Sequence, residues 1–410
     1  MISAEEMKMP LTRDDPRLHE DMVQVLQGEL DDLKVEGLYR SLRQVDGPQG
    51  PRIHIDGKEA IHFAGSDYLG LACHPLLTQA ACQATLRYGC GAAAARLISG
   101  NHDLYPQLEG RLARFKQAEA ALLFSTGYQA NLGVISALMD SQDVVFSDAL
   151  NHASIVDGCR LSRAKVMIFP HNDLAALEDL LRQETSARRR LIVVDGLYSM
   201  DGDVAPLREI VELAELYDCV TMVDDSHGIG VLGETGRGTA GATGVLGRID
   251  IETGSLSKAL GGFGAYVVGS RTVIEYLINR ARSFIFTCAL PPAVLATVLE
   301  ALTIVEQEPE RRQQLWDNTR HMRAGLREIG FEVSSSGTQI IPLIVGEPER
   351  VMRLSQGLLD RGVFAQGIRY PAVPRGTERI RLTVTASHSK ADLDAALTAL
   401  AEAWRALAFN

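Results

Sequence analysis

The sequence predicts an α/β fold with a mainly parallel central sheet covered by helices, followed by a smaller α+β domain. Helical and strand-like patterns alternate from about residue 64 to 290. The strand-like runs are apolar throughout, which is typical of strands buried on both faces of a parallel sheet. This alternation ends at about residue 291. We therefore expect an N-terminal arm and hairpin over 1–63, a large domain over 64–290 and a small domain over 291–410.

Composition limits the classes of function. The chain has 410 residues, 46% hydrophobic and 23% charged, as in a globular protein with a large core. A formal net charge of −11 argues against nucleic acid or an anionic membrane as the principal partner. The six cysteines have no paired spacing and the ten histidines no metal-binding spacing, so we expect reduced thiols and no metal. Residues 1–31 are polar, unlike a signal peptide, and no apolar run approaches membrane-spanning length, so we expect a cytoplasmic protein.

The N-terminal region contains a helical pattern and a hairpin pattern. Apolar residues recur at helical spacing within 15–45, and a Gly/Pro-rich break follows at 47–52. Residues 53–63 alternate apolar and polar side chains around Asp56-Gly57, a dipeptide typical of hairpin turns. An arm that cannot form a core alone often packs across a partner subunit.

The large domain should alternate helices and strands. The expected helices are 75–88, 104–117, 128–139, 152–162, 173–183 and 206–217, and the expected strands are 119–124, 143–147, 165–169, 190–195, 219–224 and 250–254. In the small domain we expect helices at 291–306, 310–329, 349–361 and 390–405, with strands at 339–345 and 379–384. Ser389 and Asp392 resemble a capping box for the last helix.

A lysine between small residues follows the predicted strand 250–254. Gly254 and Ser255 precede Lys258, and Gly261 and Gly262 follow it, so the backbone and a ligand can approach closely. A desolvated lysine has a lowered pKa, and its neutral amine can form an imine with an aldehyde. The alternative is a surface lysine after a strand, and this stretch alone supports both equally.

A second strand end favours the first interpretation. The apolar run 219–224 ends in Asp224, and His227 follows. Strand-end carboxylates lie at the carboxyl edge of an α/β sheet, where such sheets bind ligands. A carboxylate there can keep a pyridine nitrogen protonated and turn the ring into an electron sink. Asp224 together with Lys258 therefore suggests pyridoxal 5'-phosphate (PLP).

Two further turns lie before predicted helices. Gly127 and Tyr128 follow a Ser-Thr pair, and backbone N–H groups at a helix N-terminus bind phosphate, to which Ser255 adds a hydroxyl. The alternative is a plain strand–helix turn. His152 begins a helix after a strand, where its ring can stack on a flat cofactor, although a lone histidine is more often a cap or core residue.

Two later segments carry polar candidates. Ser199 follows the strand 190–195 and should face the same sheet edge, although Asp, Gly and Ser are also expected in an ordinary turn. Arg379 and Arg381 share one face of a predicted strand by period-two alternation. One inward arginine suits a bidentate contact with a carboxylate, and the alternative is a solvated pair at the sheet edge.

Taken together, nine ordered segments resemble the α-oxoamine synthase family, PLP enzymes with an aspartate-aminotransferase-like fold (fold-type I). The segments, spread from about residue 37 to 388, are GLYRSLR, GSDYLGLACHP, GYQAN, SDALNHASI, GLYSMDGD, MVDDSHGIG, LGETGRGT, GSLSKALGG and RIRLTVTASH. The resemblance implies a homodimer with shared active sites. It also implies that an amino acid is condensed with an acyl-CoA or acyl-carrier-protein thioester, with release of CoA and CO2.

The resemblance also implies residue roles. Lys258 condenses with the cofactor aldehyde and moves the α-proton, Asp224 pairs with the pyridinium nitrogen, and His227 bonds the ring hydroxyl. The other cofactor-binding residues it implies are Gly127, Tyr128, His152, Ser199, Ser255 and, from the other subunit, Thr287. Arg381 binds the amino-acid carboxylate, and Ser66 and Arg43 are further substrate-binding candidates.

Three positions depart from the family pattern. Ser66 replaces a usual Asn near the substrate carboxylate, Ala95 a common Ser or Thr near the amino acid, and Tyr105 a frequent His. These departures put the choice of amino acid and acyl group in doubt. L-alanine with a pimeloyl thioester is the first expectation, and glycine with acetyl-CoA the second. A catalytically silent partner subunit is a third alternative, against which the intact Lys258, Asp224 and His227 argue.

Overall fold

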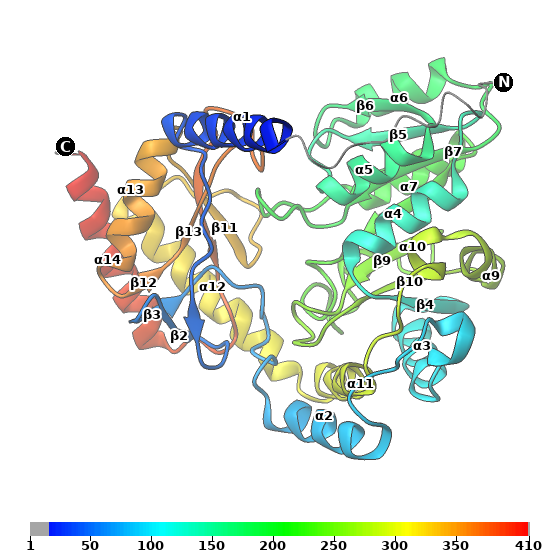
Figure 1. Ribbon diagram of the computed structural model, residues 1–410, viewed down its shortest axis with the longest axis horizontal. Helices are drawn as coiled ribbons and strands as arrows, with labels where there is room; N and C mark the ends of the chain where they lie inside the picture. Colours follow the sequence, from blue (N-terminus) through cyan, green and yellow to red (C-terminus); the bar gives the residue numbers. More distant parts are fainter. Residues whose placement is uncertain (1–15, 409–410) are drawn as a thin grey trace.

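The computed structural model describes residues 16–408, which form a large α/β part and a smaller C-terminal part side by side (Figure 1). Residues 1–15 of the expected N-terminal arm and residues 409–410 lie outside the described residues. None of the described helices is long and apolar enough to cross a membrane.

A seven-stranded sheet forms the centre of the large part, in the order β4-β10-β9-β8-β7-β5-β6. Its strands are β4 (Ala120–Phe124), β5 (Val144–Asp148), β6 (Lys165–Phe169), β7 (Arg190–Asp195), β8 (Val220–Asp224), β9 (Ile251–Ser255) and β10 (Ala265–Gly269). Strands β5 to β9 run parallel, and β10 is antiparallel to both β4 and β9. The expected α/β fold is confirmed.

Alternate residues of the central strands belong to two cores, which explains why the strands are apolar throughout. Val145, Leu191 and Val193 pack in one core with α4, α5, α9 and α10. Val144 and Ile192 pack in the other core, with α6, α7 and α8. Both faces of the sheet are therefore buried. Because β5 to β9 are parallel, their carboxyl ends lie at the same edge of the sheet.

The helices of the large part begin and end close to the predicted residues. They are α2 (Pro75–Tyr88), α3 (Leu104–Lys116), α4 (Gly127–Leu138), α5 (Ala153–Ser162), α6 (Leu174–Gln183), α7 (Leu207–Leu216), α8 (Thr239–Thr243), α9 (Arg271–Arg280) and α10 (Arg282–Ile285), with a π-helical turn η1 at Arg96–Gly100. The sequence patterns did not predict η1, α8, α9 or α10.

The C-terminal part contains a three-stranded antiparallel sheet in the order β11-β14-β13. The elements after residue 290 are α11 (Pro292–Gln307), α12 (Pro309–Ile329), β11 (Ile340–Ile344), α13 (Pro348–Leu359), β12 (Val363–Phe364), β13 (Gln366–Ile368), β14 (Arg379–Thr383) and α14 (Lys390–Ala408). Helix α11 packs against α2. The predicted capping box is confirmed, because Ser389 N–H donates to Asp392 Oδ2 at 3.0 Å and Asp392 N–H donates to Ser389 Oγ at 3.1 Å.

The N-terminal elements α1 (Pro16–Val35), β1 (Val45–Asp46), β2 (Arg52–Ile55) and β3 (Lys58–His62) lie beside the C-terminal part (Figure 1). The predicted hairpin is confirmed. Asp56 and Gly57 have φ values of 50° and 76°, as a type I′ turn requires. Strand β3 pairs in parallel with β12, so the N-terminal strands form a four-stranded sheet, in the order β1-β2-β3-β12, with one short strand of the C-terminal part. The division of the chain at residues 63 and 290 stays a prediction.

Candidate active site

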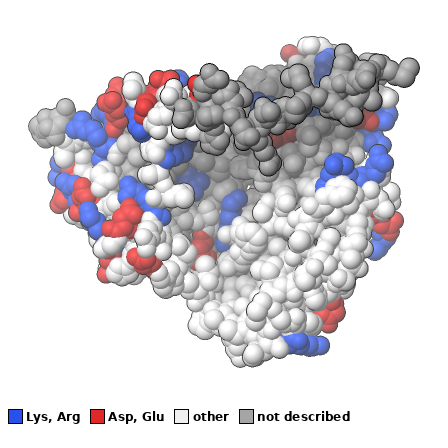
Figure 2. Space-filling view, viewed as in Figure 1, with Lys and Arg blue, Asp and Glu red and all other residues white. Residues whose placement is uncertain are grey.

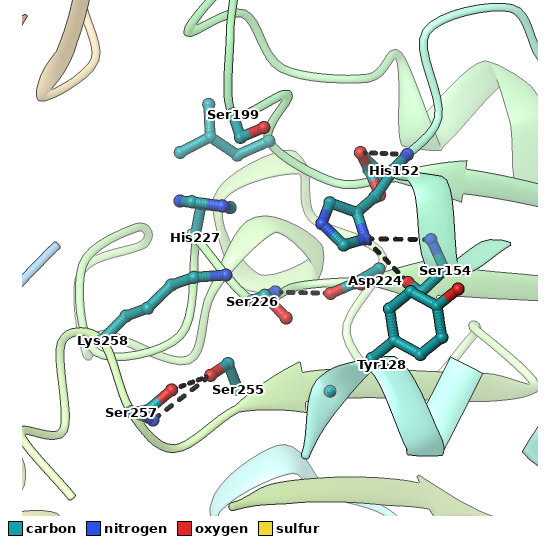
Figure 3. A pocket seen from close by; sticks show the side chains of 13 residues that line it. Tyr128, His152, Ser154, Ser199, Asp224, Ser226, His227, Ser255, Ser257 and Lys258 are labelled. Atoms are coloured by element: carbon teal, nitrogen blue, oxygen red, sulfur yellow. Dashed lines mark hydrogen bonds between the residues drawn. The ribbon is translucent and has the colours of Figure 1, made fainter. Parts of the chain in front are cut away.

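A cavity of about 200 Å³ opens at the carboxyl edge of the central sheet. The ends of β7, β8 and β9 and the N-termini of α4 and α5 supply most of its walls (Figure 3). Its lining residues are Gly127, Tyr128, His152, Ser154, Asp195, Leu197, Ser199, Asp224, Ser226, His227, Ser255, Ser257 and Lys258. The structure thus brings together eight of the predicted site residues from segments that are far apart in the sequence.

Lys258 lies in the loop that follows β9. Its carbonyl accepts a hydrogen bond from Gly261 N–H at 2.9 Å, which closes a tight turn. Gly261 has a φ of +59°, and a Cβ there would lie 2.6 Å from the backbone nitrogen of Ala72, so only glycine fits. Burial lowers the pKa of Lys258, against the opposing effect of the nearby carboxylates. A larger fraction of Lys258 is therefore in the neutral amine form that imine formation needs than of an exposed lysine.

Asp224 ends β8 and is 7% exposed. Its Oδ1 accepts from Ser226 N–H at 2.9 Å, and its Oδ2 accepts from Asn131 Nδ2 at 2.6 Å. Asp195, which ends β7, is its partner in the strand register. Burial, together with the charge of Asp224, raises the pKa of Asp195 well above its usual range. Asp195 therefore favours its neutral form more than an exposed aspartate does.

His227 lies on the loop after β8. Its Nδ1 lies 2.5 Å from the hydroxyl of Tyr68, and its carbonyl accepts from Gln339 Nε2 at 3.1 Å. Burial lowers the pKa of His227 well below its usual range, and the positive charges of Lys258 and Arg381 lower it further. The imidazole therefore favours its neutral form, with Tyr68 holding the ring and Gln339 holding the backbone of His227.

The N-terminus of α4 points toward the cavity. Thr126 caps this helix by accepting from Gln129 N–H at 3.2 Å. Among residues 16–408, the N–H groups of Gly127 and Tyr128 have no acceptor. Two free donors at the positive end of a helix dipole form a suitable site for an anion. Ser255, whose Oγ lies 2.7 Å from Ser257 Oγ, lines the same cavity.

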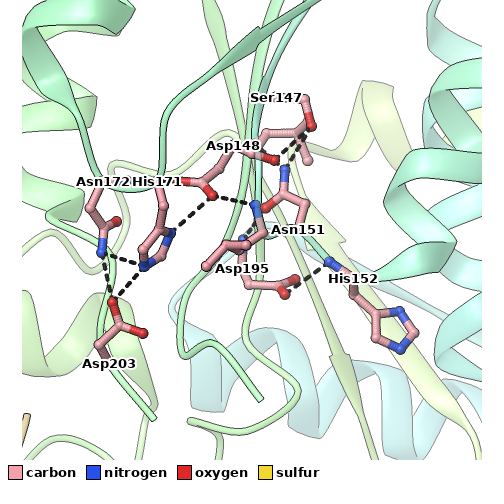
Figure 4. Close-up of polar contacts among 10 residues, drawn as sticks. Ser147, Asp148, Asn151, His152, His171, Asn172, Asp195 and Asp203 are labelled. Carbon is pink, nitrogen blue, oxygen red and sulfur yellow. Dashed lines mark hydrogen bonds and ion pairs between the residues drawn. The ribbon is translucent and has the colours of Figure 1, made fainter. Parts of the chain in front are cut away.

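His152 caps α5 at the mouth of the cavity. Its Nδ1 accepts from Ser154 N–H at 3.2 Å, and its own N–H donates to Asp195 Oδ2 at 3.1 Å (Figures 3 and 4). These contacts fix the ring relative to the ends of β5 and β7. His152 therefore caps the helix and also lines the cavity, so the two interpretations of its sequence position are compatible.

The remaining predicted residues lie outside the lining. Arg381 is adjacent, because its guanidinium donates to the carbonyl of Ser199 at 3.3 Å. Ser66 lines a neighbouring cavity of about 160 Å³ that shares Ser257 with the first. Thr287 lines a separate small cleft. Arg43 forms a 2.8 Å ion pair with Asp56 on the hairpin turn.

One of the departures from the family pattern, Tyr105, has a local explanation, and a second, Ala95, has no structural explanation. Tyr105 is 1% exposed; its hydroxyl accepts from Leu290 N–H at 2.6 Å, and the guanidinium of Arg96 lies 3.8 Å from its ring centre. Ala95 precedes η1, and its carbonyl accepts from Gly100 N–H at 3.0 Å. Neither residue lines the cavity.

Sequence reasoning missed several residues around the cavity. Asp195 ends a strand beside β8, so the strand-end argument applied to Asp224 could have found it. Asn131 and Tyr68 gave no such signal, because their partners Asp224 and His227 lie 93 and 159 residues away along the chain.

Comparison with known proteins identifies the family. The model of the family described as aminotransferase class I and II matches residues 58–400. The chain belongs to this family. It is 52% identical to an 8-amino-7-oxononanoate synthase from Geobacter sulfurreducens over 93% of this chain and 98% of that protein. Within the family, the resemblance to the α-oxoamine synthases is confirmed.

Solved structures agree with this assignment. A serine palmitoyltransferase from S. paucimobilis, with PLP and myriocin bound, is 32% identical with a TM-score of 0.90, over 95% of this chain and 99% of that one. An 8-amino-7-oxononanoate synthase from Francisella tularensis is 28% identical with a TM-score of 0.73, over 85% of this chain and 98% of that one. The fold-type I architecture and the PLP cofactor are confirmed.

The residues present fit PLP. Lys258 has no hydrogen-bond partner for its amine among residues 16–408, and it faces the same cavity as Asp224. The free N–H groups of Gly127 and Tyr128 suit the phosphate. A lysine for the aldehyde, an acid for the pyridine nitrogen and a phosphate site are therefore all present.

Proposed function

We propose that this PLP-dependent acyltransferase condenses L-alanine with a pimeloyl thioester and releases CoA and CO2. This is the reaction of an 8-amino-7-oxononanoate synthase, in biotin biosynthesis. The observation that carries the proposal is the 52% identity to a relative of that name across nearly the whole of both chains. The cavity supports it, because it contains Lys258 and Asp224 together.

Bound PLP would supply an electron sink for the charge that develops at the α-carbon of the amino acid. Lys258 would take the α-proton, since its lowered pKa favours the neutral amine that acts as a base. Asp224 would hold a proton on the pyridine nitrogen, because an ionised carboxylate beside that atom stabilises its positive charge. His227 would donate or accept at the ring hydroxyl from a fixed position.

Other residues would bind and orient. Gly127, Tyr128 and Ser255 would hold the phosphate, with Thr287 of a second subunit completing the site. His152 would stack on the ring, and Ser199 would lie beside it. Arg381 would bind the amino-acid carboxylate, which its closeness to the cavity supports. Ser66 is a candidate for the substrate side because its cavity adjoins the first; Arg43 would need to leave Asp56 to take part.

A homodimer with shared active sites is part of the proposal. Large apolar side chains are exposed in segments that flank the site, including Phe263 (49% exposed), Phe286 (71%) and Ile98 (81%). Figure 2 shows a broad area without charged side chains on one face of the molecule. Extended apolar surface is typical of a protein–protein interface. We also place the enzyme in the cytoplasm, with either CoA or a carrier protein delivering the acyl group.

The test is thiol release by the purified holoenzyme across a panel of amino acids and acyl thioesters. We expect the highest kcat/KM for L-alanine with pimeloyl thioester, and no turnover by Lys258→Ala. Robust turnover of glycine with acetyl-CoA, and none of alanine with pimeloyl thioester, would show that glycine and acetyl-CoA are the substrates instead. Absence of turnover with every pair, in a protein that binds PLP, would favour a silent subunit.

A further inference from the structure

A buried asparagine of α4 contacts two of the groups that would face the cofactor. Asn131 lies four residues after Gly127 and is 1% exposed. Its Nδ2 donates to Asp224 Oδ2 at 2.6 Å and to Ser154 Oγ at 2.9 Å. Its Oδ1 accepts from Thr253 Oγ1 at 2.8 Å. Both donors of the amide are therefore used on residues that line the cavity, and its oxygen is bound by the neighbouring strand β9.

The orientation of this amide is fixed by its neighbours. An ionised carboxylate only accepts hydrogen bonds, so the amide nitrogen must face Asp224. The amide oxygen then faces Thr253, which is also 1% exposed and donates to it. A flipped amide would place two oxygens 2.6 Å apart in a buried site, too close for a water to lie between them. Asp224 therefore selects the orientation of the amide, and the Thr253 hydroxyl satisfies the amide oxygen and anchors it to β9.

A second branch leads from the same amide to His152. Since Ser154 Oγ accepts from Asn131, its hydroxyl proton is free to be donated to His152 Nδ1, 2.7 Å away. The Ser154 N–H points to the same nitrogen at 3.2 Å. Nδ1 therefore accepts twice, and the ring proton of the neutral imidazole lies on Nε2. The serine sets the tautomer, and Asn131 sets the direction of the serine hydroxyl.

We propose that Asn131 is a positioning residue that holds the Asp224 carboxylate and the His152 imidazole in one hydrogen-bonded array with α4. This inference rests on the proposed function, because the orientation of these two groups matters only if they contact PLP. Since Asn131 and the free N–H groups of Gly127 and Tyr128 belong to the same helix, the array also fixes the ring contacts relative to the phosphate site.

Losing Asn131 should change the electrostatics of the bound cofactor in a predictable direction. Asp224 would keep one donor, Ser226 N–H, and lose the other. Without the Asn131 donor the Asp224 carboxylate can rotate about its side-chain bonds, and a carboxylate that turns away from the pyridine nitrogen stabilises the positive charge there less well. The pyridine nitrogen would then hold less positive charge, and the imine that PLP forms with Lys258 would lose its proton at higher pH. The other titratable groups that act on Asp224 or Lys258 are His152, Asp195, Arg381, His227 and Tyr266, all unchanged by the variants below.

The experiment compares three purified holoenzyme variants with the wild type. Asn131→Leu removes every hydrogen bond of the amide at similar volume. Thr253→Val removes only the hydroxyl that donates to the amide oxygen. Asn318→Leu is the matched control, because Asn318 is also buried but donates to the carbonyls of Thr385 and His388 in the C-terminal part. The readouts are the PLP dissociation constant and the pH midpoint of the visible absorption band of bound PLP.

We expect Asn131→Leu to weaken PLP binding about tenfold to a hundredfold and to raise the pH midpoint by about 0.5 to 1 unit. Thr253→Val should move both quantities in the same direction by less, and Asn318→Leu should move neither. Unchanged quantities in Thr253→Val and in any folded Asn131→Leu protein would overturn the inference and leave the proposed function intact. If Asn131→Leu does not fold, Thr253→Val decides alone. A wild-type protein without a visible band would instead refute the proposed function.

Discussion

Replacing His171 by glutamine should remove a cation from between two carboxylates. His171 Nδ1 lies 3.0 Å from Asp148 Oδ1, and its Nε2 lies 2.7 Å from Asp203 Oδ2 (Figure 4). Burial lowers the pKa of His171, but hydrogen bonds to the two carboxylates outweigh this effect and raise it from 6.5 to about 10. The imidazolium links the end of β5 to the segment that carries Ser199, so the substitution should loosen that side of the cavity.

The structure sets the size of the effect. The rise in pKa from 6.5 to about 10 limits the contribution of the charged imidazole to the free energy of unfolding to roughly 5 kcal/mol, at about 1.36 kcal/mol per pH unit. Because the side chain is 24% exposed, solvent screening reduces this to about 2–3 kcal/mol. For a chain of this length, that lowers Tm by about 2–4 °C. The folded-state pKa is raised, so the contribution is full below about pH 6.5 and is lost as the pH rises through about 10.

Thermal unfolding of the holoenzyme at about pH 6, 8 and 10 measures this contribution. We expect the Tm difference between wild type and His171→Gln to be largest near pH 6 and to shrink toward pH 10. His321→Gln is the control, because His321 pairs with Asp394 at the surface and should contribute less than about 1 kcal/mol. A Tm difference that stays constant or grows with pH would refute the reasoning.

Arg381→Ala should raise the amino-acid KM far more than the thioester KM, with a loss on the order of 2–5 kcal/mol in binding; equal effects on both constants would remove its proposed role. Asp224→Ala should lower kcat by about 10²–10⁴-fold with little loss of folded protein, as single-turnover kinetics and circular dichroism would show, and near-wild-type turnover would contradict its role. Tyr105→Phe should leave the Leu290 N–H without its acceptor, lowering stability by about 1–3 kcal/mol in thermal unfolding while PLP affinity is unchanged, and a loss of PLP affinity would place Tyr105 in the site instead.

The sequence predicted the central strands because burial on both faces leaves a clear signal. Strands β6 and β7 were predicted to the residue, and β5, β8 and β9 within one residue. The antiparallel strand β10 follows a glycine-rich loop and was missed, although its tyrosine and two valines are typical of a strand. Strands β12 and β13 have two and three residues, too few for any periodicity. Their positions depend on pairing with β3 and β14, which only the folded chain reveals.

The site was predictable where chemistry coincides with local structure. Lys258 and Asp224 follow strands, and His152 begins a helix, so each could be placed at the sheet edge before the fold was known. The contacts that orient these groups could not be predicted, since Asn131 meets Asp224 across 93 residues of sequence. For Arg43, a match to the family pattern did not predict where the side chain lies. Its segment matches the family pattern, yet its side chain pairs with the hairpin turn.

The proposed chemistry requires that one lysine, Lys258, binds the cofactor. Reduction of the holoenzyme with borohydride, followed by peptide mass mapping, tests it directly. We predict a pyridoxyl label on Lys258, with bleaching of the visible band, and no label in Lys258→Ala. Lys116, a buried lysine at the end of α3, should stay unmodified because it is paired with Asp225 at 2.8 Å. A label on Lys116, or reduction that leaves Lys258 unmodified, would contradict the account.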